Sequence, residues 1–160
     1  MKKNITIAVI IASVFMISVF ALLRSASSLV ANLGVEHRTI MVGDDIFSVD
    51  VSDSEEERQR GLSGRGRLEE GSGMLFVYDS PRIPVFWMKD MDFPIDIIWI
   101  SGGRVIGAEL NIPVERGVPE AEMRRYSPPG FVDMALEVAS GTVSRLMVTV
   151  GEPVSIEKDN

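Results

Sequence analysis

An aromatic ring, a cation and carboxylates are clustered near the middle of the chain, at Trp87, Lys89, Asp90 and Asp96. An indole ring can stack on a sugar or another flat ligand, while an ammonium and a carboxylate make directed polar contacts. These residue types are typical of a ligand-binding site. The alternative interpretation is structural, because Asp96 stands between two isoleucines and needs a partner if it is buried.

A β-hairpin would bring this charged pair together. If residues 86–90 and 95–100 are its two strands, Lys89 faces Asp96 at a separation of ~5 Å, and Trp87 shares a face with Lys89. We therefore expect an aromatic surface beside an ion pair. This pair either contacts a ligand or fixes the register of the strands.

Carboxylate catalysis is a second kind of chemistry to consider. Asp133 and Glu137 share one face of an expected strand, but four residues separate them by ~13 Å, beyond the ~5–9.5 Å of glycosidase carboxylates. A hydrolase would instead need Glu137 and Asp96 to converge in one pocket. Asp90, Asp92 and Asp96 offer oxygen ligands for Ca²⁺, but no glycine lies between them as in a calcium loop. We expect no metal and no cofactor.

Arg65 lies in a stretch rich in glycine and arginine, residues 61–67, which lacks the Lys-Ser/Thr of a phosphate-binding loop. It is a candidate ligand contact or a partner for the acidic residues of a nearby helix. The single histidine, His37, lies far from these motifs and is expected at the surface.

Composition excludes several classes of protein. The 160 residues contain 16 Lys plus Arg, 23 Asp plus Glu and no Cys, for a net charge of −7. The absence of Cys excludes disulfides, thiol nucleophiles and Cys-based zinc sites. The acidic balance argues against nucleic-acid binding, which depends on cations that neutralise phosphates.

The elements that must position these residues are mostly strands, signalled by apolar alternation or short β-rich runs. We expect strands at residues 47–51, 74–78, 85–88, 97–100, 104–110, 132–138 and 153–156. Gly102 and Gly103 predict a tight hairpin between two of them. One helix is expected at a Ser52-x-x-Glu55 capping box, ending at Gly61, and a second helical turn after Gly141.

The first 24 residues predict a membrane segment. Residues 5–23 contain no charge and as a helix would span ~28 Å, about the thickness of the bilayer core. Lys2 and Lys3 precede this run, so the positive-inside rule puts the N-terminus in the cytoplasm and the rest outside. A cleaved signal peptide is the alternative, and it too exports the remainder. Residues 25–35 read as a linker, and residues 36–157 are long enough for one domain.

Several strings recur in order through this domain, and they carry a resemblance. They are Glu57-Arg58-x-x-Gly61-Leu62, Gly73-Met74-Leu75-Phe76, Phe86-Trp87-Met88-Lys89-Asp90, Pro94-Ile95-Asp96-Ile97-Ile98 and Leu136-Glu137-x-x-x-Gly141. Over residues 47–156 the chain resembles domain-of-unknown-function family 192 (DUF192). The resemblance implies an α+β fold, mainly antiparallel, with a small barrel-like sheet and one or two helices. It implies frequent export or membrane tethering, and no established reaction. Asp90 stands where the family usually has Asn, and Ser63 where it usually has Met.

Three hypotheses follow for the function. The first is a membrane-anchored, extracytoplasmic binding or accessory domain at the cell envelope, with candidate ligand contacts at Trp87, Lys89, Asp90, Asp96, Glu137 and Arg65. The second is a hydrolase of an envelope substrate that uses Asp96 and Glu137. The third is a structural partner of another membrane protein, which would bind through residues 112–129, a long loop that is either a lid or a solvated connection.

Overall fold

The computed structural model describes residues 36–157, all within one compact unit, Glu36–Asn160. The expected membrane segment at residues 5–23 and the linker at residues 25–35 lie outside the described residues. Within the described part of the chain, no helix has the length and apolar character needed to cross a membrane.

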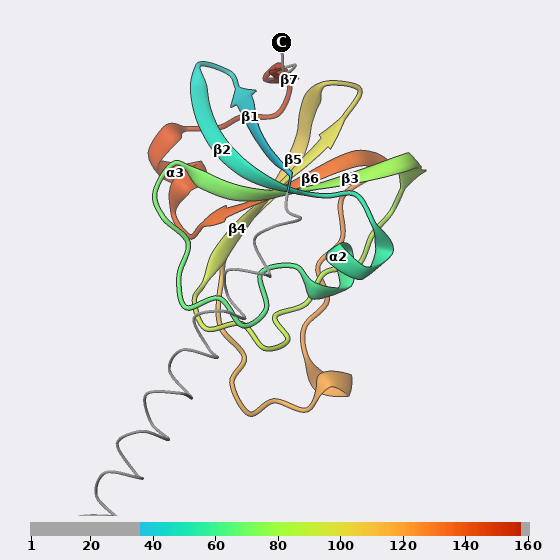
Figure 1. Ribbon diagram of the computed structural model, residues 1–160, viewed down its shortest axis with the longest axis vertical. Coiled ribbons are helices and arrows are strands. Elements are labelled where there is room, and N and C mark those ends of the chain that lie inside the picture. Colours follow the sequence, from blue (N-terminus) through green and yellow to red (C-terminus); the bar gives the residue numbers. More distant parts are fainter. Residues whose placement is uncertain (1–35, 158–160) are drawn as a thin grey trace, which may run out of the picture. The chain divides into compact units, whose positions relative to one another are not determined.

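Seven strands and three short helices make up the unit (Figure 1). In chain order they are β1 His37–Val42, β2 Asp45–Ser52, α2 Glu55–Arg60, β3 Ser72–Arg82, β4 Ile95–Ser101, β5 Arg104–Ile112, the 3-10 helix η1 Glu120–Glu122, β6 Val132–Ala139, α3 Thr142–Leu146 and β7 Val154–Ile156.

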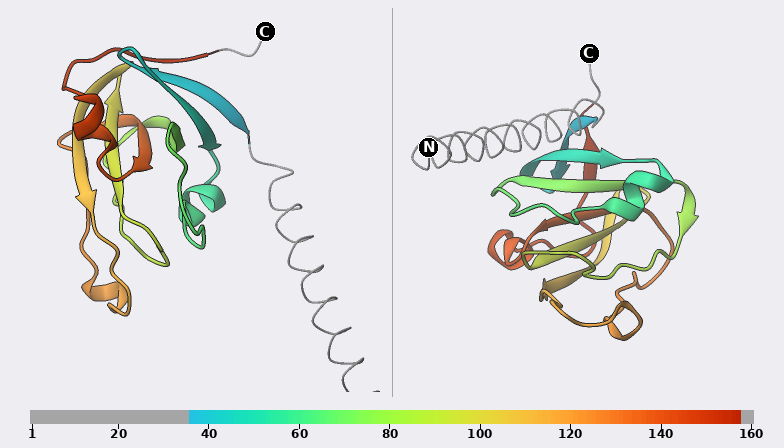
Figure 2. Two further views of the ribbon diagram at one scale, coloured as in Figure 1. Left: turned by 90° about the vertical axis from the view of Figure 1, so that its left-hand side faces the viewer. Right: turned by 60° about the horizontal axis from the view of Figure 1, so that its bottom comes forward.

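The strands form one sheet in the order β5-β4-β6-β3-β2-β1-β7. Every described pair is antiparallel except β2 with β3, which is parallel. The sheet curls into a half-barrel (Figure 2). Its two edge strands meet at one end, where Arg104 bridges Pro153 and Val154 donates a backbone hydrogen bond of 2.8 Å to Gly103. The expected α+β, barrel-like fold is thus observed for the described domain.

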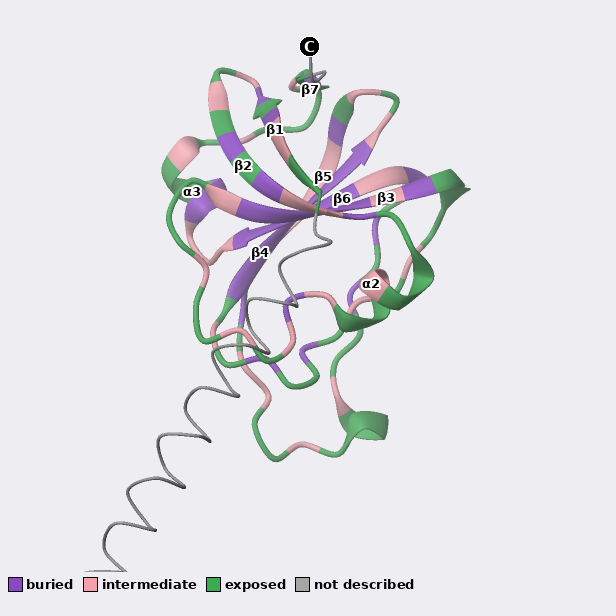
Figure 3. Ribbon diagram, in the orientation of Figure 1, coloured by how far each residue is buried: buried purple, intermediate pink, exposed green. Residues whose placement is uncertain are grey.

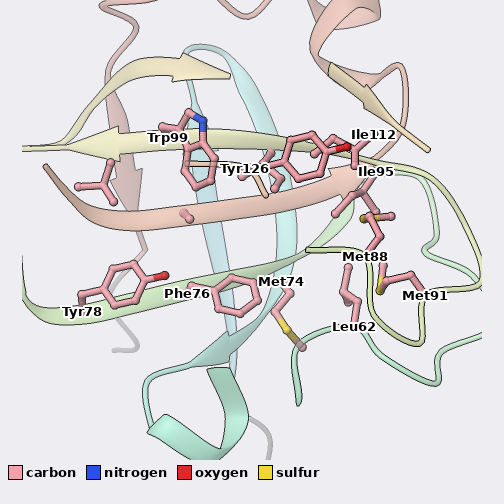
Figure 4. Close-up of a cluster of buried hydrophobic side chains, with 13 residues drawn as sticks. Leu62, Met74, Phe76, Tyr78, Met88, Met91, Ile95, Trp99, Ile112 and Tyr126 are labelled. Atoms are coloured by element: carbon pink, nitrogen blue, oxygen red, sulfur yellow. The ribbon is translucent and has the colours of Figure 1, made fainter. Parts of the chain in front are cut away.

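Two hydrophobic cores lie on the two faces of this sheet. The first contains residues from all seven strands, including Phe47, Leu75 and Ile98. The second uses the central strands together with loops that cover them, and it includes Phe76, Tyr78 and Trp99 (Figure 4). Because both faces are covered, the central strands β3, β4 and β6 are buried on both sides (Figure 3). Both cores are built from residues of this one compact unit, which supports its folding as an independent domain.

Most of the expected strands are confirmed, and one is wrong. Residues 85–88 do not form a strand, nor do they pair with β4. β4 is already bonded to β5 on one edge and β6 on the other, so it has no free edge to offer. Instead Phe86 forms an isolated bridge with Tyr126. The first strand, β1, was not expected from the sequence.

The helix α2 begins two residues later than expected. Its N-cap is Ser54, whose side chain accepts from the backbone N–H of Glu57, while the Glu57 carboxylate accepts from the Ser54 backbone. Ser52 is the buried last residue of β2, so its side chain cannot cap the helix. Gly61 ends the helix as expected, with a φ of 51° that favours glycine. The second expected helical turn is α3.

Candidate ligand-binding cleft

A cleft of about 730 Å³ opens beside α2 on the face of the sheet that carries the second core. Its base is formed by Phe76 and Tyr78 of β3 and by Glu137 of β6. Its sides come from α2, from the turn that follows α2 and from the chain between β3 and β4. The polar and aromatic side chains that line it include those of Arg58, Tyr78, Arg82, Phe86, Trp87, Lys89, Asp90, Glu120 and Glu137.

Glu137 is the buried carboxylate of the cleft. The sheet register places it between Met74 of β3 and Ile97 of β4, on the face where loops cover the sheet. Its side chain belongs to a residue only 6% exposed, and its Oε2 has no hydrogen-bond partner among the described residues. Burial raises the pKa of Glu137 to about 8, against a smaller opposing effect of the Arg65 guanidinium. The carboxyl is therefore neutral at pH 7 and can donate a hydrogen bond.

Tyr78 of β3 also lines the base of the cleft, and its ring is flanked by two guanidinium groups. Those of Arg58 and Arg82 lie 5.6 and 5.4 Å from the centre of its ring, within cation–π distance. Burial raises the pKa of the Tyr78 hydroxyl, so it stays protonated at neutral pH. Arg58 is held in place because it donates to the backbone carbonyl of Val77 at 2.9 Å and to that of Asp53.

Trp87 and Lys89 lie on the outer rim. The indole is 37% exposed and carries the Arg125 guanidinium 4.9 Å from the centre of its ring. Lys89 forms an ion pair with Glu120, with 2.7 Å between Nζ and Oε2. Hydrogen bonding and charge within this pair raise the pKa of Lys89 and lower that of Glu120. The long loop 112–129 thus contributes to the rim of the cleft through Glu120.

The expected pair of Lys89 with Asp96 is wrong. Asp96 is fully buried, and its side chain points to the opposite face of the sheet from Glu137, because its neighbour on β6 is Val138. Its two carboxylate oxygens accept backbone hydrogen bonds from Asn111 at 2.7 Å and Val143 at 2.9 Å. Asp96 therefore fastens β5 and α3 to β4. The two carboxylates of the hydrolase hypothesis do not share a pocket.

Arg65 does not pair with the acidic residues of α2, as the sequence had allowed. It forms an ion pair with Asp50 of β2, which also pairs with the Nδ1 of His37 at 2.7 Å. His37 has an exposed side chain, as expected. Arg65 acts on the cleft only through its charge, which opposes the rise in the pKa of Glu137.

The backbone conformation at position 90 explains why an Asp is accommodated there. Its φ is 55°, in the left-handed region that Asn and Asp tolerate better than other residues with a Cβ. The carbonyl of Asp90 accepts from the Gly64 backbone at 3.0 Å, and the neighbouring Lys89 carbonyl accepts from the Ser63 hydroxyl at 2.9 Å. Asn and Asp therefore both suit this turn. Asp92 pairs with Arg116 at 3.0 Å.

Four of the six candidate residues line the cleft, namely Trp87, Lys89, Asp90 and Glu137, whereas Arg65 and Asp96 do not. Tyr78, Arg82 and Phe76 also line the cleft but were not predicted from the sequence. Glu137 was predicted, and it stands on β6 among apolar neighbours, at a register position that faces the second core. The expected polar face of that strand is in fact covered by loops.

The fold and the cleft define a small half-barrel domain with a partly apolar site that contains a neutral buried acid. The chain belongs to the DUF192 family, described as "Uncharacterized ACR", whose model matches residues 38–156. No curated protein sequence matches it.

Two solved structures are similar to this chain. One is a protein of unknown function from Novosphingobium aromaticivorans, 26% identical with a TM-score of 0.64, covering 76% of this chain and 84% of that one. The other is a putative transcription regulator from Sinorhizobium meliloti, 24% identical with a TM-score of 0.68, covering 78% of this chain and 97% of that one. The second likeness concerns the fold alone.

Proposed function

We propose that the domain is a binding module whose cleft takes a ligand with a hydrogen-bond acceptor at one end and an apolar or flat body. The observation that carries this proposal is the Oε2 of Glu137 at the base of the cleft, for which residues 36–157 supply no hydrogen-bond partner. A buried polar atom without a hydrogen-bond partner lowers the stability of the fold. The simplest explanation for such an atom in a cleft is that a ligand supplies the missing partner.

The cleft has the composition of a ligand site. Its base is apolar and aromatic, with few polar groups, and its volume falls within the usual range for small-molecule sites. Phe76 and Phe86 pack edge to face with 5.0 Å between their ring centres, which forms a stiff apolar wall. A neutral carboxyl against this wall suits a carbonyl or hydroxyl oxygen better than a cation, because the rim already carries Arg58 and Arg82.

A fragment screen tests this function. Residues 36–160 are titrated with a panel of neutral aromatic amides and alcohols, and binding is followed by NMR shifts of backbone amides. We expect hits whose shifts map to the cleft, and whose affinity falls about tenfold in Glu137→Leu, because one buried hydrogen bond is lost. Glu137→Gln keeps a donor and retains more of the affinity. Glu157→Leu, an exposed site beyond β7, is the matched control.

The pH dependence of binding gives a second test of the same proposal. The affinity for a neutral acceptor is expected to stay level below pH 8 and to fall above it, as Glu137 ionises and ceases to donate. Hits that bind equally well to Glu137→Leu, or whose shifts map outside the cleft, would contradict the proposal.

The location of the domain is the second part of the proposal. We infer from the uncharged run at residues 5–23, preceded by Lys2 and Lys3, that the chain is anchored in a membrane with the domain outside. Cleavage after this run would release the same domain in exported form. The test is alkaline extraction of membranes combined with protease added to spheroplasts, from which any outer layers of the envelope have been removed. A domain that resists protease until the spheroplasts are lysed would contradict it.

A further inference from the structure

The segment 83–87 forms one side of the cleft and has the burial pattern of a strand. Ile83, Val85 and Trp87 are 51%, 49% and 37% exposed, whereas Phe86 packs against the second core. An alternation with period two is typical of an extended chain. Three apolar side chains therefore stand in a row along the opening of the cleft.

One backbone edge of this segment is paired and the other is not. The N–H of Phe86 donates to the carbonyl of Tyr126 at 2.9 Å, and the Tyr126 N–H donates to the Phe86 carbonyl at 3.0 Å. In an extended chain the backbone groups of the neighbouring residues point to the opposite edge. Those of Val85 and Trp87 make no hydrogen bond with any residue that the structure describes.

The unpaired edge borders the cleft. Residues 83–87 line the cleft on one side, and α2 lines it on the other. Figure 1 shows α2 and the connection that carries η1 on the same side of the sheet. Tyr126, at the end of that connection, occupies the paired edge of Phe86, so the other edge is left for an incoming chain.

Arg82 supplies a charge next to this edge. Other cations of the rim are paired: Arg58 with Glu55 at 3.4 Å, and Lys89 with Glu120 at 2.7 Å. Arg82 makes no ion pair with a carboxylate within the described residues 36–157, and its guanidinium lies over Tyr78. It is thus available to an anionic group of a ligand.

We propose that the cleft binds an extended peptide segment of a partner protein, which adds a strand along residues 83–87 and places a carboxylate at Arg82. Strand addition draws its affinity from main-chain hydrogen bonds and its specificity from alternate side chains. The apolar row of Val85 and Trp87 suits apolar side chains at alternate positions of the peptide. This inference rests on the proposed function and names its ligand class, with a peptide carbonyl as the acceptor for Glu137.

The first experiment is a selection of displayed random peptides of about ten residues, long enough to cover the edge, on residues 36–160. The affinities of the selected peptides are then measured by fluorescence polarisation against Val85→Pro and Val85→Ala. Val85→Pro removes an N–H that has no partner in the described structure, and we expect about a tenfold loss of affinity. Val85→Ala keeps that N–H and is expected to lose about threefold. Arg82→Gln weakens only the peptides that carry a carboxylate.

A second measurement does not depend on how the variants fold. Each amide of one selected peptide is N-methylated in turn. Because a strand bonds through one edge at alternate residues, we expect losses of affinity with period two along the peptide. Equal losses at successive positions, equal binding to Val85→Pro and Val85→Ala, or no enriched peptide would overturn the proposal. So would binding of this face to phosphatidylcholine–phosphatidylglycerol vesicles in place of peptides.

The two proposals fail separately. If neutral fragments bind at Glu137 but no peptide is selected, the cleft is a small-molecule site and strand addition is refuted. Peptides that are selected but bind equally to wild type and Glu137→Leu would retain strand addition and refute the role of Glu137.

Discussion

Asp96 and Glu137 lie on neighbouring strands, one register step apart, and both are buried carboxylates. They differ in what their oxygens contact. The oxygens of Asp96 accept two backbone N–H groups, whereas the Oε2 of Glu137 has no partner among the described residues. The carboxylate on the first face thus joins β4 to β5 and α3, whereas the Glu137 carboxyl on the second face makes no comparable connection through its Oε2 within the described residues.

The two faces of the sheet therefore place their buried carboxyl groups in different roles. On the first face, the buried carboxylate of Asp96 accepts hydrogen bonds from two backbone N–H groups, one at Asn111 and one near the start of α3. On the second face, the Glu137 carboxyl lies beside an open cleft, and its unsatisfied Oε2 lowers the stability of the fold. A buried polar group that stabilises nothing is a better guide to a site than one that is fully bonded.

The largest effect is expected from Asp96→Ala. The substitution leaves two buried N–H groups without an acceptor, and it should lower the free energy of unfolding by ~3–5 kcal/mol. Asp96→Asn keeps one acceptor and should lose roughly half as much. Urea denaturation of residues 36–160 measures both, with Asp44→Ala in the exposed turn after β1 as control. A loss below about 1 kcal/mol would mean that Asp96 does not fasten α3 and β5.

Glu137→Gln is expected to raise the free energy of unfolding, whereas Asp96→Ala lowers it. The folded protein keeps the proton of Glu137 up to about pH 8, whereas the unfolded chain loses it near 4.5. Between these pH values the folded state binds more protons than the unfolded chain. The contribution of Glu137 to the free energy of unfolding is therefore complete below pH 4.5 and is lost as the pH rises towards 8. The variant does not ionise and should be more stable than wild type by ~3 kcal/mol at pH 7.

The pH series distinguishes this cause from simple repacking. The gain of Glu137→Gln over wild type should shrink towards zero near pH 4.5, where both side chains are neutral. Glu157→Gln, at an exposed position, should show no such series. A gain of constant size at all pH values would refute the assignment to ionisation.

The smallest effect is expected from the exposed carboxylate of the rim. Glu120→Gln breaks the ion pair with Lys89, but both side chains are about half exposed and solvent screens them. The midpoint of thermal unfolding should therefore stay within experimental error. A shift as large as that of Asp96→Asn would show that the rim is part of the structural framework, and the contrast between the two faces would then weaken.

Much of the sheet was predictable because its patterns are local. The hairpin at Gly102 and Gly103, the strand at residues 132–138 and the end of α2 at Gly61 all follow from alternation or turn chemistry. β1 lacked a clear pattern, since only Ile40 and Val42 are buried in it. The capping box was misplaced because Ser52 and Ser54 both precede an acidic residue three positions on.

The site was harder to predict because it depends on distant pairings. Lys89 and Asp96 looked like hairpin partners, but β4 pairs with β5 and β6. The Gly102-Gly103 turn indicates the first of these pairings, whereas no local pattern reveals the second. Trp87, Lys89, Asp90 and Glu137, which were chosen for their chemical types, all line the cleft, and their role as ligand contacts stays a prediction. Tyr78 and Arg82 went unnoticed because only the curvature and the covering loops give them a role.

The one parallel pair among the described strands has an evolutionary consequence. Since β2 and β3 run in the same direction, the chain must return across residues 53–71 before β3 begins, and this return carries α2 and the turn at Gly61. One side of the cleft is therefore built from a connection that the topology requires but whose sequence the sheet does not constrain. Insertions and deletions there can alter what the cleft accepts without disturbing strand register, so relatives could diversify their ligands on an unchanged half-barrel.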